Sequence, residues 1–341
     1  MKKILFFALS TLLFVSCSKS DDPFEGQAAP NANYSNGILF VNEGNFGTPN
    51  SSIGFSSFDY QNIKSDIYNR DSLTLGDVAQ SMGFKDDKAF IVVNNSDKIE
   101  VVHRYSFQPQ ATITEGVNKP RYTAFTNNKL YVTNSGSKSV TVYSLKDYSL
   151  LKEIKLNTAV EYIVAQNNKL YVQQAAFGSG NSIAVIDGNT DNLIKTFKCQ
   201  DNLQGLVAHA GFVYAISSID NRSNFYKINT ETDTFVRELT STKVRGAKNL
   251  RVSDNKLYYT AKNDIHVWEP LASIIDYTPL FSVKGELTYS SMYGFDVINN
   301  QFLISNAEDF NSPSTVQVYD MKGTKITTFK TGISTNHFYK N

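Results

Sequence analysis

The sequence predicts an all-β fold, a seven-bladed β-propeller of four-stranded antiparallel blades. Three observations support this prediction. A short apolar strand pattern recurs at a nearly constant spacing, and turns rich in Asn and Gly separate the strands. The repeats at the two ends of the chain are incomplete in complementary ways.

Residues 127–156 contain the clearest copy of the repeat. They predict three short strands, at 129–134, 139–144 and 150–156, with Asn, Gly, Ser or Asp in each gap. The other copies align on the residue equivalent to Tyr131. The anchors are Leu39, Ile91, Tyr131, Tyr171, Tyr214, Tyr258 and Leu303. They lie 52, 40, 40, 43, 44 and 45 residues apart, which is the period of a propeller blade.

Each complete repeat has a predicted inner strand before its anchor strand and further strands after it. The inner strands are predicted at 78–84, 121–126, 161–166, 203–209, 248–253 and 292–298. The strands that follow the anchors are predicted at 53–59, 98–103, 139–144, 183–187, 224–228, 265–269 and 316–320. Outer strands come last, as at 193–198 and 325–330.

The first repeat starts directly with its anchor strand at Gly37 and has no inner strand. The chain ends with 333–339, which supplies an inner strand with nothing after it. We therefore expect the C-terminal strand to pair with the N-terminal blade and to close the ring, which removes the open sheet edge. Six complete repeats and one shared repeat make seven blades over residues 37–341.

Residues 1–16 have the pattern of a signal peptide. Lys2 and Lys3 precede an apolar run at 4–15 that is too short to span a bilayer. Val15-Ser16-Cys17 resembles a bacterial lipobox, which implies cleavage before Cys17 and lipidation of that residue. An ordinary signal peptide followed by a chance cysteine is the alternative.

Residues 17–36 predict a polar, flexible tether. Its Ser20-Asp21-Asp22 segment resembles the acidic surface-export signal of Bacteroidota lipoproteins, and a plain solvated linker is the alternative. The resemblance implies an outer-membrane protein that is lipid-anchored and faces the cell exterior, with a soluble domain and contact to the membrane through the lipid alone.

Charge and cysteine content exclude several classes of protein. The net charge of +1 gives no basic surplus, so nucleic acid is not expected as a partner. Cys199 is the sole cysteine after Cys17, which leaves no internal disulfide and no multi-cysteine metal site. We expect Cys199 to be a small buried side chain.

The YVTN sequence at 131–134, together with the strands that follow it, resembles the YVTN (YncE-like) propeller family over about residues 37–339. The segments 38–59, 92–102, 120–125 and 175–187 resemble Bacteroidota surface propellers of that family. Some of these are BtuG-type lipoproteins, which capture cobalamin at the cell surface and pass it to a TonB-dependent transporter. The resemblance implies a bound corrinoid, no covalent cofactor and such a transporter as partner. Phe177 departs from the tryptophan common at this position.

In a propeller, the loops after the anchor strands and the starts of the inner strands share one face around the central channel. We expect the ligand site on this face, with long loops at 43–51, 174–181, 217–224 and 306–314. The candidate ligand-binding residues are Asn42, Glu43, Asn45, Phe46, Asn94, Arg121, Tyr122, Asn134, Glu161, Tyr162, Gln174, Phe177, Gln204, Lys248, Asn249, Tyr293, Asn306 and His337. Their amides suit the rim of a corrinoid, and their rings suit its flat faces.

Each type of candidate has a structural alternative. The asparagines after the anchors can cap turns, and the aromatic residues can belong to the core. Arg121 and Glu161 can form a salt bridge between neighbouring blades.

Signals for catalysis are few. His103, His209, His266 and His337 fall in separate repeats, and no Gly-x-Ser-x-Gly elbow is present. We therefore expect a binding protein with no catalytic residues. A propeller enzyme such as a lactonase and an adhesion or scaffold propeller are the alternatives.

Two further motifs have local interpretations. Asp187-x-Asn189-x-Asp191 has the spacing of calcium ligands but lacks the glycine and the distal glutamate of a calcium loop, so no metal is expected. Ser72, within Asp71-Ser72-Leu73, resembles a short O-glycosylation motif of this bacterial group.

Overall fold

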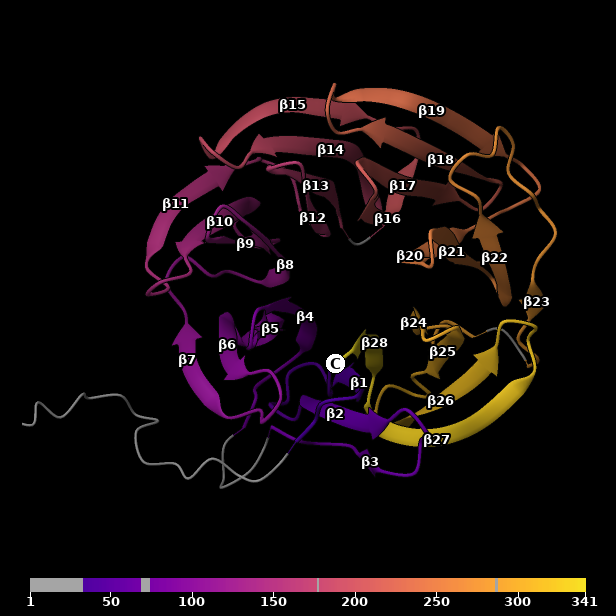
Figure 1. The fold of residues 1–341 in the computed structure, drawn as a ribbon, viewed down its shortest axis with the longest axis horizontal. Helices are drawn as coiled ribbons and strands as arrows, with labels where there is room; N and C mark the ends of the chain where they lie inside the picture. The colour runs from indigo at the N-terminus through magenta and orange to yellow at the C-terminus, as the bar shows by residue number, and fades with distance from the viewer. Residues whose placement is uncertain (1–32, 69–73, 177, 286–287) are drawn as a thin grey trace, which may run out of the picture.

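A computed structural model describes residues 33–68, 74–176, 178–285 and 288–341. In it, seven four-stranded antiparallel sheets stand around a central channel (Figure 1). The predicted fold class is therefore confirmed. Cys17, Ser72 and Phe177 lie outside the described residues. Within the described ranges, no helix is long and apolar enough to cross a membrane.

Each blade runs from an inner strand beside the channel to an outer strand at the periphery (Figure 1). Blade 1 contains β28 (Thr335–Lys340), β1 (Gly37–Asn42), β2 (Ser52–Ser57) and β3 (Ile63–Lys64); blade 2 contains β4 (Ala79–Lys85), β5 (Lys88–Val93), β6 (Lys98–His103) and β7 (Pro109–Ile113); blade 3 contains β8 (Pro120–Thr126), β9 (Lys129–Asn134), β10 (Ser139–Ser144) and β11 (Leu150–Lys155). A 3₁₀ turn, η1 (Asn94–Ser96), follows β5.

The remaining blades repeat this order. Blade 4 contains β12 (Ile163–Gln166), β13 (Lys169–Ala176), β14 (Ser179–Asp187) and β15 (Asn192–Lys198); blade 5 contains β16 (Asn202–His209), β17 (Phe212–Ile219), β18 (Arg222–Asn229) and β19 (Thr234–Ser241). Blade 6 contains β20 (Ala247–Ser253), β21 (Lys256–Ala261), β22 (Asp264–Trp268) and β23 (Phe281–Ser282); blade 7 contains β24 (Gly294–Ile298), β25 (Gln301–Asn306), β26 (Pro313–Asp320) and β27 (Lys325–Ile333).

The ring closes as the incomplete end repeats predict. β28 pairs with β1, so that Tyr339 lies opposite Leu39 and His337 opposite Val41. The Asn341 backbone N–H donates to the Gly37 carbonyl at 2.9 Å. The C-terminal strand is therefore the inner strand of the N-terminal blade.

The core lies between successive blades. Because side chains alternate between the two faces of a strand, β9 sends Leu130 and Val132 toward Phe90 of blade 2, and Tyr131 toward Val172 of blade 4. Burial on both faces explains why the anchor strands read as apolar runs and why the outer strands, with one open face, alternate.

A repeated contact ties neighbouring blades together. The Tyr131 hydroxyl donates to Asp191 at 2.5 Å, and Lys129 pairs with the same carboxylate at 2.7 Å. Tyr171 and Lys169 make the equivalent contacts with Asp233, at 2.5 and 2.6 Å. The Asp191 carboxylate, one of the three residues with calcium-ligand spacing, is therefore engaged by the neighbouring blade.

The other members of that motif shape a turn. Asp187 Oδ1 accepts hydrogen bonds from the backbone N–H groups of Asn189 and Thr190, both at 2.9 Å. Among the described residues, no group of three His, Cys, Asp or Glu side chains is placed to hold a metal ion.

Two predicted long loops are wrong. The residues at 174–181 and 217–224 mostly continue the hairpins β13–β14 and β17–β18, with Gln174 paired to Ser182 and Ser217 paired to Asn224. Their Ser, Gly and Asn content indicated loops, but backbone pairing continues beyond the apolar core and needs no apolar side chain. The predicted loops after Asn42 and Asn306 are confirmed, at 43–51 and 307–312.

Candidate functional site

All seven inner strands begin at one end of the channel, which we call the channel mouth. In blades 1, 2, 3, 5 and 6 the pairing of the inner strand shifts register at this end. Such irregularities re-aim side chains. The residues at or beside these shifts, and at the same end of blades 4 and 7, are Asn336, Gln80, Arg121, Gln204, Lys248, Glu161 and Tyr293.

Arg121 connects three blades at the mouth. Its Nε donates to both carboxylate oxygens of Glu161, at 2.9 and 3.0 Å, and its Nη2 donates to Glu161 Oε1 at 2.6 Å. Its Nη1 donates to the side-chain oxygen of Gln80. Burial opposes the charge on Arg121, but the Glu161 carboxylate outweighs this effect and raises the arginine pKa. Arg121 and Glu161 are therefore an ion pair.

Glu43 continues the network on the other side of Gln80. Asn336 Nδ2 donates to the Gln80 carbonyl at 2.8 Å and to Glu43 Oε1 at 2.7 Å. The Tyr293 hydroxyl donates to Glu43 Oε2 at 2.5 Å. A continuous chain of hydrogen bonds thus joins blades 4, 3, 2, 1 and 7 around the mouth. Shielding from water raises the pKa of Glu43, against the opposing hydrogen bonds from Tyr293 and Asn336.

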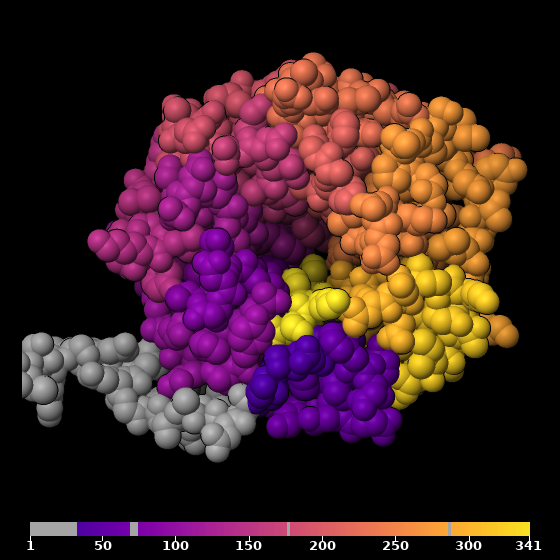
Figure 2. Space-filling view, in the orientation of Figure 1, coloured from indigo at the N-terminus to yellow at the C-terminus, as the bar shows by residue number. Residues whose placement is uncertain are grey.

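A cavity of about 480 Å³ opens above this network. Glu43 and Arg121 line its polar part, and Phe46, Tyr293 and Phe310 line its apolar part. Its volume lies within the range of small-molecule sites. The centre of the ring is also visibly hollowed in the space-filling view (Figure 2).

The aromatic wall of this cavity is held by contacts between blades 1 and 7. Asn45 Nδ2 donates to the Phe310 carbonyl at 2.8 Å, which ties the loop after β1 to the loop after β25. Phe310 stacks on Tyr289 with ring centroids 5.1 Å apart, and Tyr293 meets it edge-on at the same distance. Phe46 is 82% exposed, so its ring is available to a ligand.

A second hollow of about 430 Å³ lies at the mouth beside blades 5 and 6. Gln204 and Lys248 contribute its inner wall, and Ser218 and Asp220 its outer wall. Burial lowers the pKa of Lys248. This hollow offers a cation and an amide, whereas the first cavity offers a carboxylate and aromatic rings.

Aromatic side chains occupy the channel below the mouth. The rings of Tyr122 and Tyr162 lie 4.3 Å apart, and the Tyr122 hydroxyl lies 3.4 Å from His337 Nε2. Burial holds the pKa of His337 well below its usual value, and Arg251 and Arg121 add to this effect. His337 is therefore neutral at pH 7.

Several predicted site residues bond to the protein instead of facing either cavity. Asn42 bonds to Ser52 and Thr335, and Asn134 bonds to Thr141. The other three have equivalent partners: Gln174 donates to Thr158, Asn249 to Thr260, and Asn306 accepts from the Glu308 backbone. Asn94 donates to the Pro120 carbonyl and also lines the first cavity.

Sequence reasoning missed Gln80 and Phe310. Gln80 lies inside a predicted inner strand, and no sequence signal showed that the register shift between Ala79 and Ser81 would turn it toward Arg121. Phe310 lies in a predicted loop on the site face, so its aromatic side chain could have been included among the candidate ligand-binding residues.

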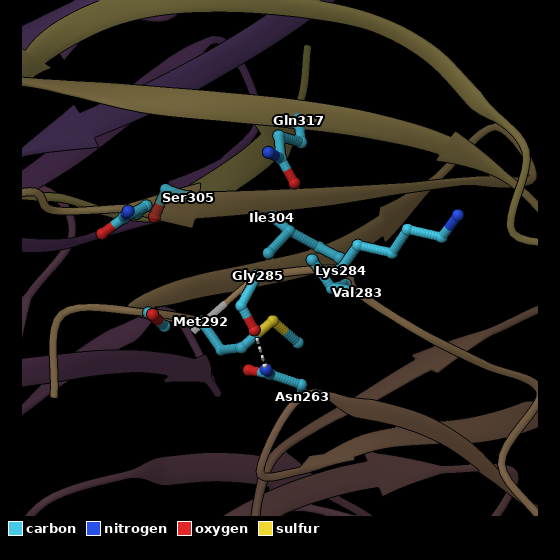
Figure 3. A pocket seen from close by; sticks show the side chains of 10 residues that line it. Asn263, Val283, Lys284, Gly285, Met292, Ile304, Ser305 and Gln317 are labelled. Carbon is cyan, nitrogen blue, oxygen red and sulfur yellow. Dashed lines mark hydrogen bonds between the residues drawn. The ribbon is translucent and has the colours of Figure 1, made fainter. Parts of the chain in front are cut away.

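A smaller crevice of about 190 Å³ separates blades 6 and 7 (Figure 3). Asn263 Nδ2 donates to the Gly285 carbonyl at 3.2 Å, and Met292 and Ile304 are among the apolar residues that line the crevice. Lys284 extends away from it (Figure 3). Asn306, one of the predicted site residues, also lines this crevice.

Comparison with known proteins identifies a family and confirms the architecture. Residues 36–339 match the family model described as "Domain of unknown function (DUF5074)". No curated protein matches the chain.

Solved structures share the fold at low sequence identity. A quinoprotein alcohol dehydrogenase-like protein from Bacteroides thetaiotaomicron is 16% identical, with a TM-score of 0.71 over 91% of this chain and 80% of that chain. A protein from Lactobacillus plantarum is 13% identical, with a TM-score of 0.65 over 89% of this chain and 98% of that one. Apo AztD from Citrobacter koseri is 11% identical, with a TM-score of 0.55 over 89% and 97%.

Proposed function

The chain belongs to the DUF5074 family of domains of unknown function, and we propose that it captures a small ligand at the channel mouth by binding and release. One observation carries this proposal. Charged and polar side chains from five blades form a continuous network, and its members Glu43, Gln80 and Arg121 line a cavity that aromatic rings also line.

A purely structural role does not require this arrangement. Burying Arg121, Glu161 and Glu43 costs free energy, and apolar packing would stabilise the ring at least as well. The network fixes these side chains before a ligand arrives, so that little conformational entropy is lost on binding. A preorganised polar floor beneath aromatic rings suits a ligand with flat apolar faces and a polar rim.

The first ligand to test is cobalamin, and the proposed partner is a TonB-dependent outer-membrane transporter. Two resemblances support this version: segment 38–59 is similar to Bacteroidota surface propellers, some of which are BtuG-type, and the sequence at Cys17 is similar to a lipobox. In it, the protein is lipid-anchored on the outer surface of the outer membrane and hands its ligand to the transporter.

Calorimetric titration of the purified chain with cyanocobalamin tests the ligand. We expect saturable heat, and we expect Phe46→Ala to weaken binding by about fivefold because it removes an exposed aromatic contact worth about 1 kcal/mol. Tyr277→Ala is the matched control, since Tyr277 is also exposed, at 62%, but lies outside the mouth. Absence of heat at about 50 μM, where a micromolar Kd would be visible, refutes cobalamin.

Membrane fractionation tests the proposed anchor. In a host that processes lipoproteins, we expect the wild-type chain in the membrane fraction and Cys17→Ser in the soluble fraction. Cys199→Ser is the control, because Cys199 is buried inside the propeller. A Cys17→Ser variant that stays in the membrane fraction like the wild type would contradict lipidation at Cys17.

A further inference from the structure

The hydrogen-bonded chain at the mouth stops at blades 5 and 6. It runs from Glu161 in blade 4 through blades 3, 2 and 1 to Tyr293 in blade 7. The remaining two blades present Gln204 and Lys248 at this end. Across the part of the chain that the structure describes, the side chains of these two residues form no hydrogen bond.

Lys248 differs from the other cation in this ring of residues. Arg121 is neutralised by Glu161, with the guanidinium and carboxylate 2.6 Å apart. The Lys248 ammonium has no carboxylate within 4.0 Å among the described residues, although the side chain is half-buried. Burial is the sole cause that lowers its pKa, with no compensating charge.

The surroundings of Lys248 suit an anionic oxygen group. The hollow of about 430 Å³ is lined by further polar groups from Asn202, Gln204 and Ser218. Asp220 is exposed at its outer wall, where it repels an anion that approaches from that side. An anion therefore fits best on the inner side, between Lys248 and Gln204.

We infer that this hollow receives an anionic oxygen group of the captured ligand, a phosphate or a carboxylate, which pairs with the Lys248 ammonium and accepts a hydrogen bond from the Gln204 amide. The inference rests on the proposed function, because it assigns one part of the ligand. It makes the mouth bipartite, with an aromatic cavity beside blades 1 and 7 and an anion site beside blades 5 and 6.

Chemical labelling tests the anion site without knowledge of the ligand. An N-hydroxysuccinimide ester acylates neutral amines, so a lowered pKa favours the reaction and a bound anion, which pairs with the ammonium form, opposes it. The labelling of Lys248 is measured by mass spectrometry in chloride, inorganic phosphate and acetate of equal ionic strength. Lys243, exposed in the loop that leads into β20, is the internal reference.

At about 10 mM anion, roughly ten times a millimolar Kd, we expect phosphate, acetate or both to slow Lys248 acylation several-fold and to leave Lys243 unchanged. The anion that protects better identifies the group. Equal effects of all three salts on Lys248 and Lys243 would overturn the inference.

Corrinoids then separate this inference from the proposed function. Cyanocobalamin carries a phosphodiester and cobinamide lacks it. We expect Lys248→Met to weaken cyanocobalamin about tenfold, the loss of one charge-assisted hydrogen bond, and to leave cobinamide unchanged. Gln204→Met should act in the same direction more weakly, and Lys243→Met should change neither ligand.

The outcomes distinguish the two proposals. If neither corrinoid binds the wild type while phosphate still protects Lys248, the cobalamin assignment fails and the anion site stands. If Lys248→Met weakens both corrinoids equally, the site does not recognise the phosphodiester and the inference fails. Thermal melts of all variants confirm that each one is folded.

Discussion

Removal of Arg121 should destabilise the protein far more than removal of an ordinary surface cation. Arg121→Leu leaves the Glu161 carboxylate without the three hydrogen bonds that it accepts from the guanidinium, at 2.6, 2.9 and 3.0 Å. Glu161 is buried, so water cannot replace them fully. An unpaired buried charge of this kind costs about 3–5 kcal/mol.

A double variant distinguishes the effect of the unpaired charge on stability from the effect of lost packing. Arg121→Leu with Glu161→Leu removes both charges, and we expect its stability to lie within about 1 kcal/mol of the wild type, because apolar replacement of a buried pair is often neutral. Lys155→Met is the control, since Lys155 and Glu153 form an exposed pair whose loss costs about 0–1 kcal/mol.

Urea unfolding at several pH values measures these differences. Burial raises the pKa of Glu161 in the folded protein. Because the carboxyl pKa is raised, the protonated group contributes stability below the pKa of the unfolded state, near 4.5. This contribution is lost as the pH rises through the pKa of the folded state. Arg121 opposes this rise, so its removal raises the folded-state pKa of Glu161 further. The stability deficit of Arg121→Leu relative to the wild type should therefore grow from pH 4.5 to pH 8.

Two results would refute this reasoning. One is a cost below about 1 kcal/mol for Arg121→Leu at pH 8, which would mean that water solvates Glu161. The other is a double variant as unstable as the single variant, which would place the effect in packing.

Three more predictions concern the ring. Asp191→Asn should lower the free energy of unfolding in urea by about 1–3 kcal/mol, because it leaves Lys129 without its carboxylate partner. Asp220→Asn, at an exposed position, should leave it almost unchanged, and equal losses would refute the contact between blades 3 and 4. Phe338→Ala should lower the free energy of unfolding by about 3–5 kcal/mol, because Phe338, in the strand that closes the ring, is buried in an apolar cluster. Phe46→Ala should lower it by less than about 0.5 kcal/mol, and similar values for the two variants would contradict closure by β28. The pKa of His337 is depressed in the folded protein, so its contribution to stability is present above pH 6.5 and is lost as the pH falls toward its folded-state pKa. Urea unfolding at pH 7.5 and pH 5 should therefore show that His337→Phe loses less stability on acidification than the wild type. An identical loss in the two proteins would argue against a buried neutral imidazole.

The fold was largely predictable because the repeat is encoded locally. Strand β9 has the predicted bounds, Lys129–Asn134, and the incomplete end repeats predicted that β28 pairs with β1. Apolar runs between Asn-rich turns define such strands without knowledge of their neighbours. The hairpins of blades 4 and 5 were harder, because their ends are paired by backbone hydrogen bonds that polar side chains do not signal.

The sequence predicted which face of the propeller holds the site, but it did not predict most of the contacts between the site residues. The placement of Glu43, Arg121 and Tyr293 on one face follows from the propeller topology. Their assembly into one network depends on the register shift that turns Gln80 inward and on Asn336 from the other end of the chain. The shift has no signature in the sequence. The Arg121–Glu161 link, in contrast, was predicted as the structural alternative, a salt bridge between neighbouring blades.

The central claim is that a ligand binds at the channel mouth. Hydrogen–deuterium exchange of the chain with and without saturating cyanocobalamin tests it most directly. We predict slower exchange in peptides that cover 43–51, 202–206, 245–250 and 306–314, and unchanged exchange at 209–212 and 269–271, which belong to another hollow, beside His209 and Leu271. Protection confined to the latter segments, or no protection anywhere, would contradict the claim.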